Sequence, residues 1–185
     1  MRPDKRMVAI MNNDFFDESK VFFQNGDIAN TIEQFGKAIS NIDPKQTEMQ
    51  SEYVSFLKSV LERCRSERLT EEEARVLRML GRIHSLFNQH YESLNYHRES
   101  LKIQRKLGRK ADLADGLILL ADSLQINGKY DECLDALKTA AEIFHDLGRL
   151  KREKEVINQI AHLKEFSKQM VEDEYYVRKF NIRRE

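Results

Sequence analysis

The sequence repeats itself at a spacing of forty residues. The tripeptide Leu-Gly-Arg at 107–109 returns at 147–149. Other positions match in size as well as polarity when the chain is shifted by this length: Leu77 with Leu117 and Ile157, Leu80 with Leu120 and Ile160, and the small residues Gly81, Ala121 and Ala161. A fixed period of this length predicts an array of similar units, each of which buries its apolar face by stacking on its neighbours.

Each unit is expected to contain two helices. Leucines recur every three or four positions over 111–127, which is the spacing of one helix face: Leu113, Leu117, Leu120 and Leu124. Gly128 ends this helix, because glycine accepts the left-handed backbone conformation that follows many helices. A second helix starts near Tyr130 and ends at Leu147-Gly148. A turn this short joins two helices only as an antiparallel hairpin.

The stretch 119–144 resembles one tetratricopeptide repeat. A leucine followed by a small residue, a glycine and an aromatic residue at the turn, and small residues along the second helix occupy the places of that family's pattern: Leu120, Ala121, Gly128, Tyr130, Cys133 and Ala140. The forty-residue spacing is similar to the longer repeats of kinesin light chains, Pins-like G-protein modulators and Rap-type regulators. The resemblance implies an all-α array of antiparallel helical hairpins that forms a right-handed superhelix.

We expect a single domain over 1–185. Its parts are a divergent repeat (15–44), an inserted helix (46–67), two repeats (73–108 and 111–148), a capping helix (151–170) and a charged, flexible tail (171–185). Thr70 and Glu73 have the spacing of a capping box, in which each side chain accepts a hydrogen bond from the backbone of the other.

Composition limits the classes of partner. Lys+Arg and Asp+Glu number 31 each, so the net charge is zero, which argues against nucleic acid as a ligand. No stretch approaches the roughly 20 apolar residues of a transmembrane helix, so no membrane insertion is expected. Cys64 and Cys133 lie on apolar helix faces, where buried, reduced thiols are expected. These features predict a cytoplasmic protein.

No motif for catalysis, metal binding or cofactor binding is found. The sequence lacks a phosphate-binding glycine loop, an HExxH motif, a CxxC motif and a nucleophile elbow. His84 and His97 occupy places where the resembling family often has an aromatic residue, so we expect them to pack rather than to hold a metal. The sequence therefore predicts a protein that is not an enzyme and needs no cofactor.

The resemblance implies a partner-binding face, because the first helix of each tetratricopeptide hairpin lines an inner groove. The expected residues point away from the second helix of their own hairpin. They are Arg75, Arg78, Arg82 and Ser85 on 73–88, Asp115, Ile118, Asp122 and Gln125 on 111–127, Glu155, Asn158, His162 and Glu165 on the capping helix, and Phe16, Lys20 and Phe23 near the N-terminus.

Arg75, Arg78 and Arg82 form one stripe, since they are three and four residues apart. Guanidinium groups pair well with carboxylates, so the expected ligand is an acidic peptide or helix of another protein. In the alternative, Arg82 pairs with Asp122, and Arg75 or Arg78 pairs with Asp115. The expected function is a scaffold or adaptor. Two other functions remain open: a regulator that senses a short peptide, and a structural protein that forms homo-oligomers through its tail.

Overall fold

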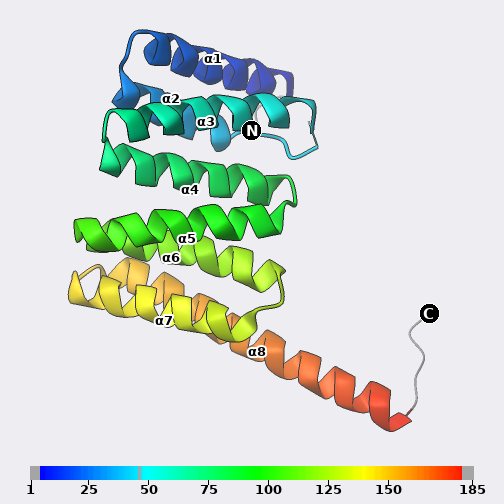
Figure 1. Cartoon of the computed structure of the whole chain (residues 1–185). Coiled ribbons are helices and arrows are strands. Elements are labelled where there is room, and N and C mark those ends of the chain that lie inside the picture. The colour runs from blue at the N-terminus through cyan, green and yellow to red at the C-terminus, as the bar shows by residue number, and fades with distance from the viewer. Residues whose placement is uncertain (1–4, 46, 181–185) are drawn as a thin grey trace. The chain divides into compact units, whose positions relative to one another are not determined.

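The computed structural model describes residues 5–45 and 47–180, with side chains over 14–45 and 47–169. In this part of the chain there are eight α-helices, one short 3-10 helix at Thr47–Met49 and no strand. The helices are α1 (Lys5–Gln24), α2 (Ile28–Ile39), α3 (Gln50–Ser66), α4 (Thr70–Leu86), α5 (His90–Leu107), α6 (Lys110–Ile126), α7 (Tyr130–Asp146) and α8 (Leu150–Phe180) (Figure 1). The predicted all-α array of helical hairpins is confirmed.

The helices form two compact units, which are described separately. Unit 1 covers Met1–Arg109 and contains α1 to α5. Unit 2 covers Lys110–Glu185 and contains α6 to α8. Within unit 1, α4 packs against α2, α3 and α5, and within unit 2, α7 packs against both α6 and α8.

The forty-residue repeat sets the start of every helix from α3 onwards. The odd-numbered helices α3, α5 and α7 begin at residues 50, 90 and 130, and the even-numbered helices α4, α6 and α8 begin at 70, 110 and 150. The helix predicted as an insertion is therefore α3, a regular odd-numbered helix. Its buried positions match those of α5 at the same spacing: Tyr53, Leu57, Val60, Leu61 and Cys64 correspond to Ser93, His97, Ser100, Leu101 and Gln104.

A residue in the left-handed conformation follows each helix from α3 to α7. These residues recur every twenty positions, at Arg68, Asn88, Gly108, Gly128 and Gly148, with φ between 58° and 71°. The amide of the next residue then bonds to a carbonyl in the last helical turn, as Leu69 N does to Cys64 O at 2.8 Å. This hydrogen bond closes the helix end and reverses the chain within three residues.

Arg68 adopts this left-handed conformation although it carries a Cβ, which costs about 1 kcal/mol relative to glycine. We therefore expect Arg68→Gly to raise the free energy of unfolding by about 1 kcal/mol in urea denaturation. The matched control is Lys102→Gly in the middle of α5, which should lower it by about the same amount. A loss of stability in Arg68→Gly would contradict the role given to this turn.

The predicted capping box at the start of α4 is wrong. The residue before the helix is Leu69 rather than Thr70, and no side chain caps the first amides. The Thr70 hydroxyl lies 3.4 Å from the Arg68 carbonyl, and the Glu73 carboxylate pairs with Arg65 of α3 at 2.8 Å. The left-handed turn at Arg68 starts α4 one residue before the predicted place, so Thr70 is already inside the helix.

Aromatic rings join α1 to α3 in the core of unit 1. The ring centroid of Phe16 lies 4.8 Å from that of Tyr53 and 5.5 Å from that of Phe56. Phe16 is only 1% exposed. The prediction that Phe16, Lys20 and Phe23 face a groove is therefore wrong for this helix, since all three contact α3. Because α1 packs beside α3, it belongs to the same structural class as the odd-numbered helices. The sequence analysis had instead treated it as the first helix of a hairpin.

α5 packs closely on α4 where His97 meets Gly81. A Cβ added to Gly81 would lie 2.5 Å from the imidazole ring, and His97 is buried. His84 is also buried and stacks on Tyr96, with ring centroids 5.2 Å apart. Both histidines therefore pack within the fold, as the sequence predicted.

We expect Gly81→Ala to lower the free energy of unfolding by about 2 kcal/mol, because the methyl group overlaps a ring that the core holds in place. The control is Gly36→Ala in α2, where the added Cβ would lie 3.3 Å from the flexible end of Met79. That change should be neutral or should stabilise the chain by up to about 1 kcal/mol, as alanine favours helix. Equal effects of the two substitutions in urea denaturation would contradict the packing account.

α8 is longer than the predicted capping helix, since it runs for 31 residues from Leu150 to Phe180. Val156 and Leu163 are buried, whereas Leu150, Ile157 and Phe166 are exposed. Residues 181–185 of the predicted tail lie outside the described residues, and side chains are described only as far as 169.

Candidate functional site

A groove in unit 2 runs between α6 and α8, with α7 as its floor. One part, of about 320 Å³, is lined by Ala121, Asp122 and Gln125 of α6, Cys133 and Leu137 of α7, and Gln159, His162, Leu163 and Phe166 of α8. An adjoining part of about 400 Å³ is lined by Asp122, Gln125, Ile126, Tyr130 and Phe166. We name this feature the α6–α8 groove.

The repeat explains which side chains meet in the α6–α8 groove. Asp122 and His162 are forty residues apart, so they take equivalent positions on two even-numbered helices and face the same space. Gln125 lies one turn after Asp122 on the same side of α6. Three of the residues predicted for partner binding are therefore brought together.

Apolar side chains form the rim of the groove at its second part. Ile126 is 55% exposed and Phe166 is 43% exposed, and these two residues are also forty positions apart. The Phe166 ring lies 5.9 Å from that of Tyr130. The sequence analysis did not include Ile126 or Phe166 among the expected binding residues. The repeat position shared by Leu86, Ile126 and Phe166 could have indicated this rim.

The carboxyl group of Asp122 is partly shielded from water although the residue as a whole is exposed. This desolvation raises the pKa of Asp122 above its ordinary value. Burial, followed by the charge of Asp122, raises the pKa of the Cys133 thiol to about 11. The thiol is therefore protonated at neutral pH and is a poor nucleophile.

Asp115, another predicted binding residue, is held by α8. Its carboxylate accepts a hydrogen bond from Arg152 at 2.7 Å, and the same guanidinium bonds to Glu155 at 2.7 Å. These two hydrogen bonds outweigh desolvation and raise the pKa of Arg152. Asp115 therefore joins two helices of unit 2. Ile118 is half-buried and Asn158 is exposed, and neither lines the α6–α8 groove.

The predicted arginine stripe lies on α4 in unit 1. Arg75, Arg78, Arg82 and Ser85 are all partly exposed. Desolvation, and then the positive charge of Arg78, lowers the pKa of Arg82. Over 14–45 and 47–109, no carboxylate pairs with Arg75, Arg78 or Arg82. We name these three residues the arginine face. The alternative ion pairs, of Arg82 with Asp122 and of Arg75 or Arg78 with Asp115, would join the two units. They stay a prediction.

His97 lies beneath the arginine face and stays neutral. Burial, and then the charges of Arg78 and Arg82, lowers its pKa to about 4. A positive charge on this ring would be both desolvated and close to two guanidinium groups. The ring therefore supports α4 by packing and carries no charge at neutral pH.

The low pKa of His97 makes stability depend on pH. In the unfolded chain the imidazole binds a proton below about pH 6.5, whereas the folded protein resists protonation down to about pH 4. The free energy of unfolding therefore has its full value, as far as His97 is concerned, above pH 6.5. It falls by roughly 3 kcal/mol as the pH falls to 4. Urea denaturation across this range measures the loss.

The control is His97→Leu, because leucine occupies the repeat-equivalent positions Leu57 and Leu137. This variant should lose the share of the pH dependence that comes from this ring, while His84, whose pKa burial also lowers, and Asp122, whose pKa desolvation raises, keep theirs. An unchanged slope between about pH 4 and 6.5 in His97→Leu would contradict the assignment.

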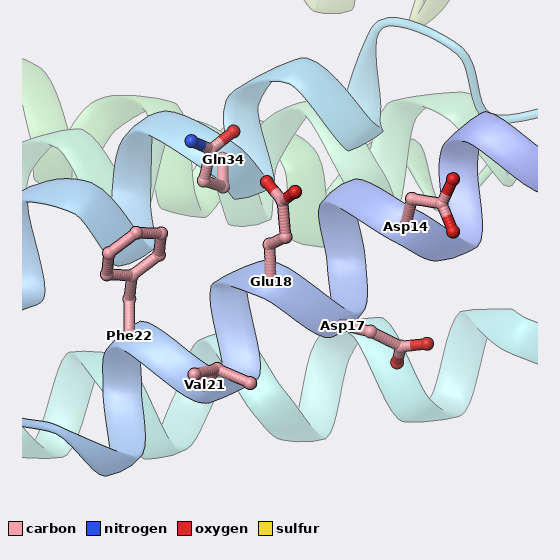
Figure 2. A pocket seen from close by; sticks show the side chains of 6 residues that line it. All are labelled: Asp14, Asp17, Glu18, Val21, Phe22 and Gln34. Carbon is pink, nitrogen blue, oxygen red and sulfur yellow. The ribbon is translucent and has the colours of Figure 1, made fainter.

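A second pocket lies on α1 in unit 1. It has a volume of about 610 Å³ and is lined by Asp14, Asp17, Glu18, Val21 and Phe22 of α1 and Gln34 of α2. Figure 2 shows Glu18 and Phe22 on the side of α1 that faces Gln34. Val21 is 55% exposed. We name this feature the acidic pocket; the sequence analysis did not predict it.

Among the described residues, no group of three or more His, Cys, Asp or Glu side chains is placed to hold a metal ion. In the same residues, no helix is long and apolar enough to cross a membrane. Cys64 and Cys133 are both free and buried.

Comparison with known proteins identifies the fold. No family model matches the sequence, and no curated protein matches it. Among solved structures, BtubC (BKLC) from P. vanneervenii matches with a TM-score of 0.70 at 15% identity, over 85% of this chain and 64% of that one. The apo form of RapI matches with a TM-score of 0.60 at 12% identity, over 91% of this chain and 68% of that one.

A Rap protein in complex with Competence and Sporulation Factor matches with a TM-score of 0.57 at 14% identity, over 91% of this chain and 52% of that one. The chain thus spans between half and about two-thirds of the length of these proteins. Likeness at such low identity establishes the fold, and the chain has a tetratricopeptide-like helical repeat fold. Rap-type regulators are among the proteins whose repeats the sequence resembles.

Proposed function

We propose that this chain is a protein-interaction scaffold whose α6–α8 groove holds a peptide or a helix of a partner protein. The groove itself carries the proposal. Asp122 and His162 face it from two helices, and Ile126 and Phe166 expose apolar surface beside them. A concave surface that combines apolar contact area with a few converging polar groups suits an extended or helical ligand.

The chemistry of the groove favours a particular ligand side chain. Asp122 is partly desolvated, so a cation placed beside it gains more from the ion pair than it would in water. The neighbouring rings of Tyr130 and Phe166 offer a face for the apolar stem of the same side chain. A lysine or arginine next to an apolar residue is the ligand pattern that fits.

The arginine face offers a different contact. Three guanidinium groups lie on one stripe, and desolvation, followed by the charge of Arg78, lowers the pKa of Arg82 among them. Carboxylates of an acidic peptide would relieve this repulsion through paired hydrogen bonds. We therefore include an acidic segment of the partner in the proposal, with Arg75, Arg78 and Arg82 as its ligands.

A second candidate function is the sensing of a short peptide. The support is the fold shared with a Rap protein that was solved in complex with Competence and Sporulation Factor. Under either function the role is binding rather than catalysis, in keeping with the protonated thiol of Cys133 at the groove floor. A cytoplasmic location belongs to the same proposal.

The test is affinity capture from native lysate with identification of bound proteins by mass spectrometry. Wild type is compared with a groove variant (Asp122→Lys with Phe166→Ala) and an arginine variant (Arg75→Glu, Arg78→Glu and Arg82→Glu). The matched control reverses three exposed charges of α5: Lys102→Glu, Arg105→Glu and Lys106→Glu. We expect all variants to keep their helicity and nearly their melting temperature, because none of these positions belongs to the core.

Loss of a partner with the groove variant, and its retention by the control, is the expected result. Loss with the arginine variant as well would assign the acidic segment to the arginine face. Retention of every partner by the groove variant would overturn the proposal for the groove. Thermal stabilisation by a short peptide, without any protein partner, would favour the second candidate.

A further inference from the structure

α8 exposes a face that the preceding even-numbered helices bury. Leu77 of α4 is 0% exposed, and Leu117 of α6 is 3% exposed. The equivalent residue of α8 is Ile157, which is 49% exposed. The next position along this face is Gly81 in α4 and Ala121 in α6, both buried, whereas Ala161 in α8 is exposed. In α4 this face is covered by α5, since Ser100 bonds to Ala74 and the His97 ring lies against Gly81.

The open face of α8 combines apolar and basic side chains. Its members are three or four residues apart and are all exposed: Leu150, Lys154, Ile157, Ala161 and Lys164. Residues at this spacing form one stripe along a helix. Lysine flanking a small apolar strip predicts a covering helix that is apolar in part and acidic in part.

α1 has the matching character. It packs beside α3 as an odd-numbered helix, and the acidic pocket lies along its exposed side (Figure 2). Asp14 and Glu18 supply negative charge there, while Val21 and Phe22 supply apolar surface. Among the described side chains, α8 thus exposes a basic and apolar face, and α1 exposes an acidic and apolar one.

The α4–α5 hairpin gives the register in which the two faces would meet. The Ser100 hydroxyl of α5 donates to the Ala74 carbonyl of α4 at 2.7 Å. Alignment of α1 with α5 on the left-handed residues that follow them, Gly26 and Gly108, places Glu18 at the position of Ser100. The forty-residue repeat places Lys154 at the position of Ala74. The register therefore sets a carboxylate beside an ammonium group.

We propose that α1 of a second copy of this chain docks antiparallel on the open face of α8. Glu18 of one copy then pairs with Lys154 of the other, Phe22 covers Leu150, and the Asp14 end of α1 lies towards Lys164. The contact joins two different surfaces, so each copy keeps one free end, and copies add head to tail into open chains or closed rings. It is independent of the α6–α8 groove, which lies on another side of α8.

Sedimentation velocity over a range of protein concentrations at low salt tests the proposal. We expect the average mass of the wild type to rise with concentration and to fall when salt screens the charges. Lys154→Glu alone and Glu18→Lys alone should each weaken association about tenfold or more, because like charges would then oppose each other. Lys102→Glu on α5 is the matched control and should associate like the wild type.

An equimolar mixture of the Lys154→Glu and Glu18→Lys chains provides the sharpest result. Every contact between unlike chains again brings opposite charges together, so we expect association close to that of the wild type. Both positions are exposed, and unchanged circular dichroism would show that neither variant is unfolded. A wild type that stays monomeric at all concentrations, or a mixture that associates no better than its components, would overturn the proposal.

Discussion

The left-handed turn that follows each helix from α3 to α7 is the constraint on which the rest of the structure depends. It returns every twenty residues, and its backbone hydrogen bond stops each helix and sends the chain back. Helices of nearly equal length with identical turns present equivalent residues at a spacing of forty. Glycine meets this requirement at three of the five turns, and Arg68 and Asn88 meet it with some backbone strain.

Because the helices alternate between two kinds, each kind has its own surface. The even-numbered helices offer one side to the odd-numbered helices and another to the α6–α8 groove, which Asp122 and His162 line. The same alternation leaves α8 with an exposed face whose equivalent on α4 is covered by α5. One repeat thus accounts for both the α6–α8 groove and the open face of α8, and it places them on different sides of that helix.

Much of the helical array could be predicted from sequence, because the repeat is visible in residues such as Leu77, Leu117 and Ile157. The place of α3 was missed, since Tyr53, Ser93 and Cys133 share a buried position while differing in chemistry. Burial also depends on neighbours that residue type does not reveal: Leu117 is 3% exposed and Ile157 is 49% exposed. The partner of Asp115 was unforeseen for a similar reason, because Arg152 lies 37 positions later in the sequence, on α8.

The central claim is that partners bind on the side of the even-numbered helices that forms the α6–α8 groove. A photo-cross-linking amino acid placed at position 166, and in a second variant at position 138 on the exposed side of α7, tests it most directly in native lysate. The account predicts that the partner cross-links from position 166 and not from position 138. Equal cross-linking from both positions, or cross-linking from position 138 alone, would contradict it.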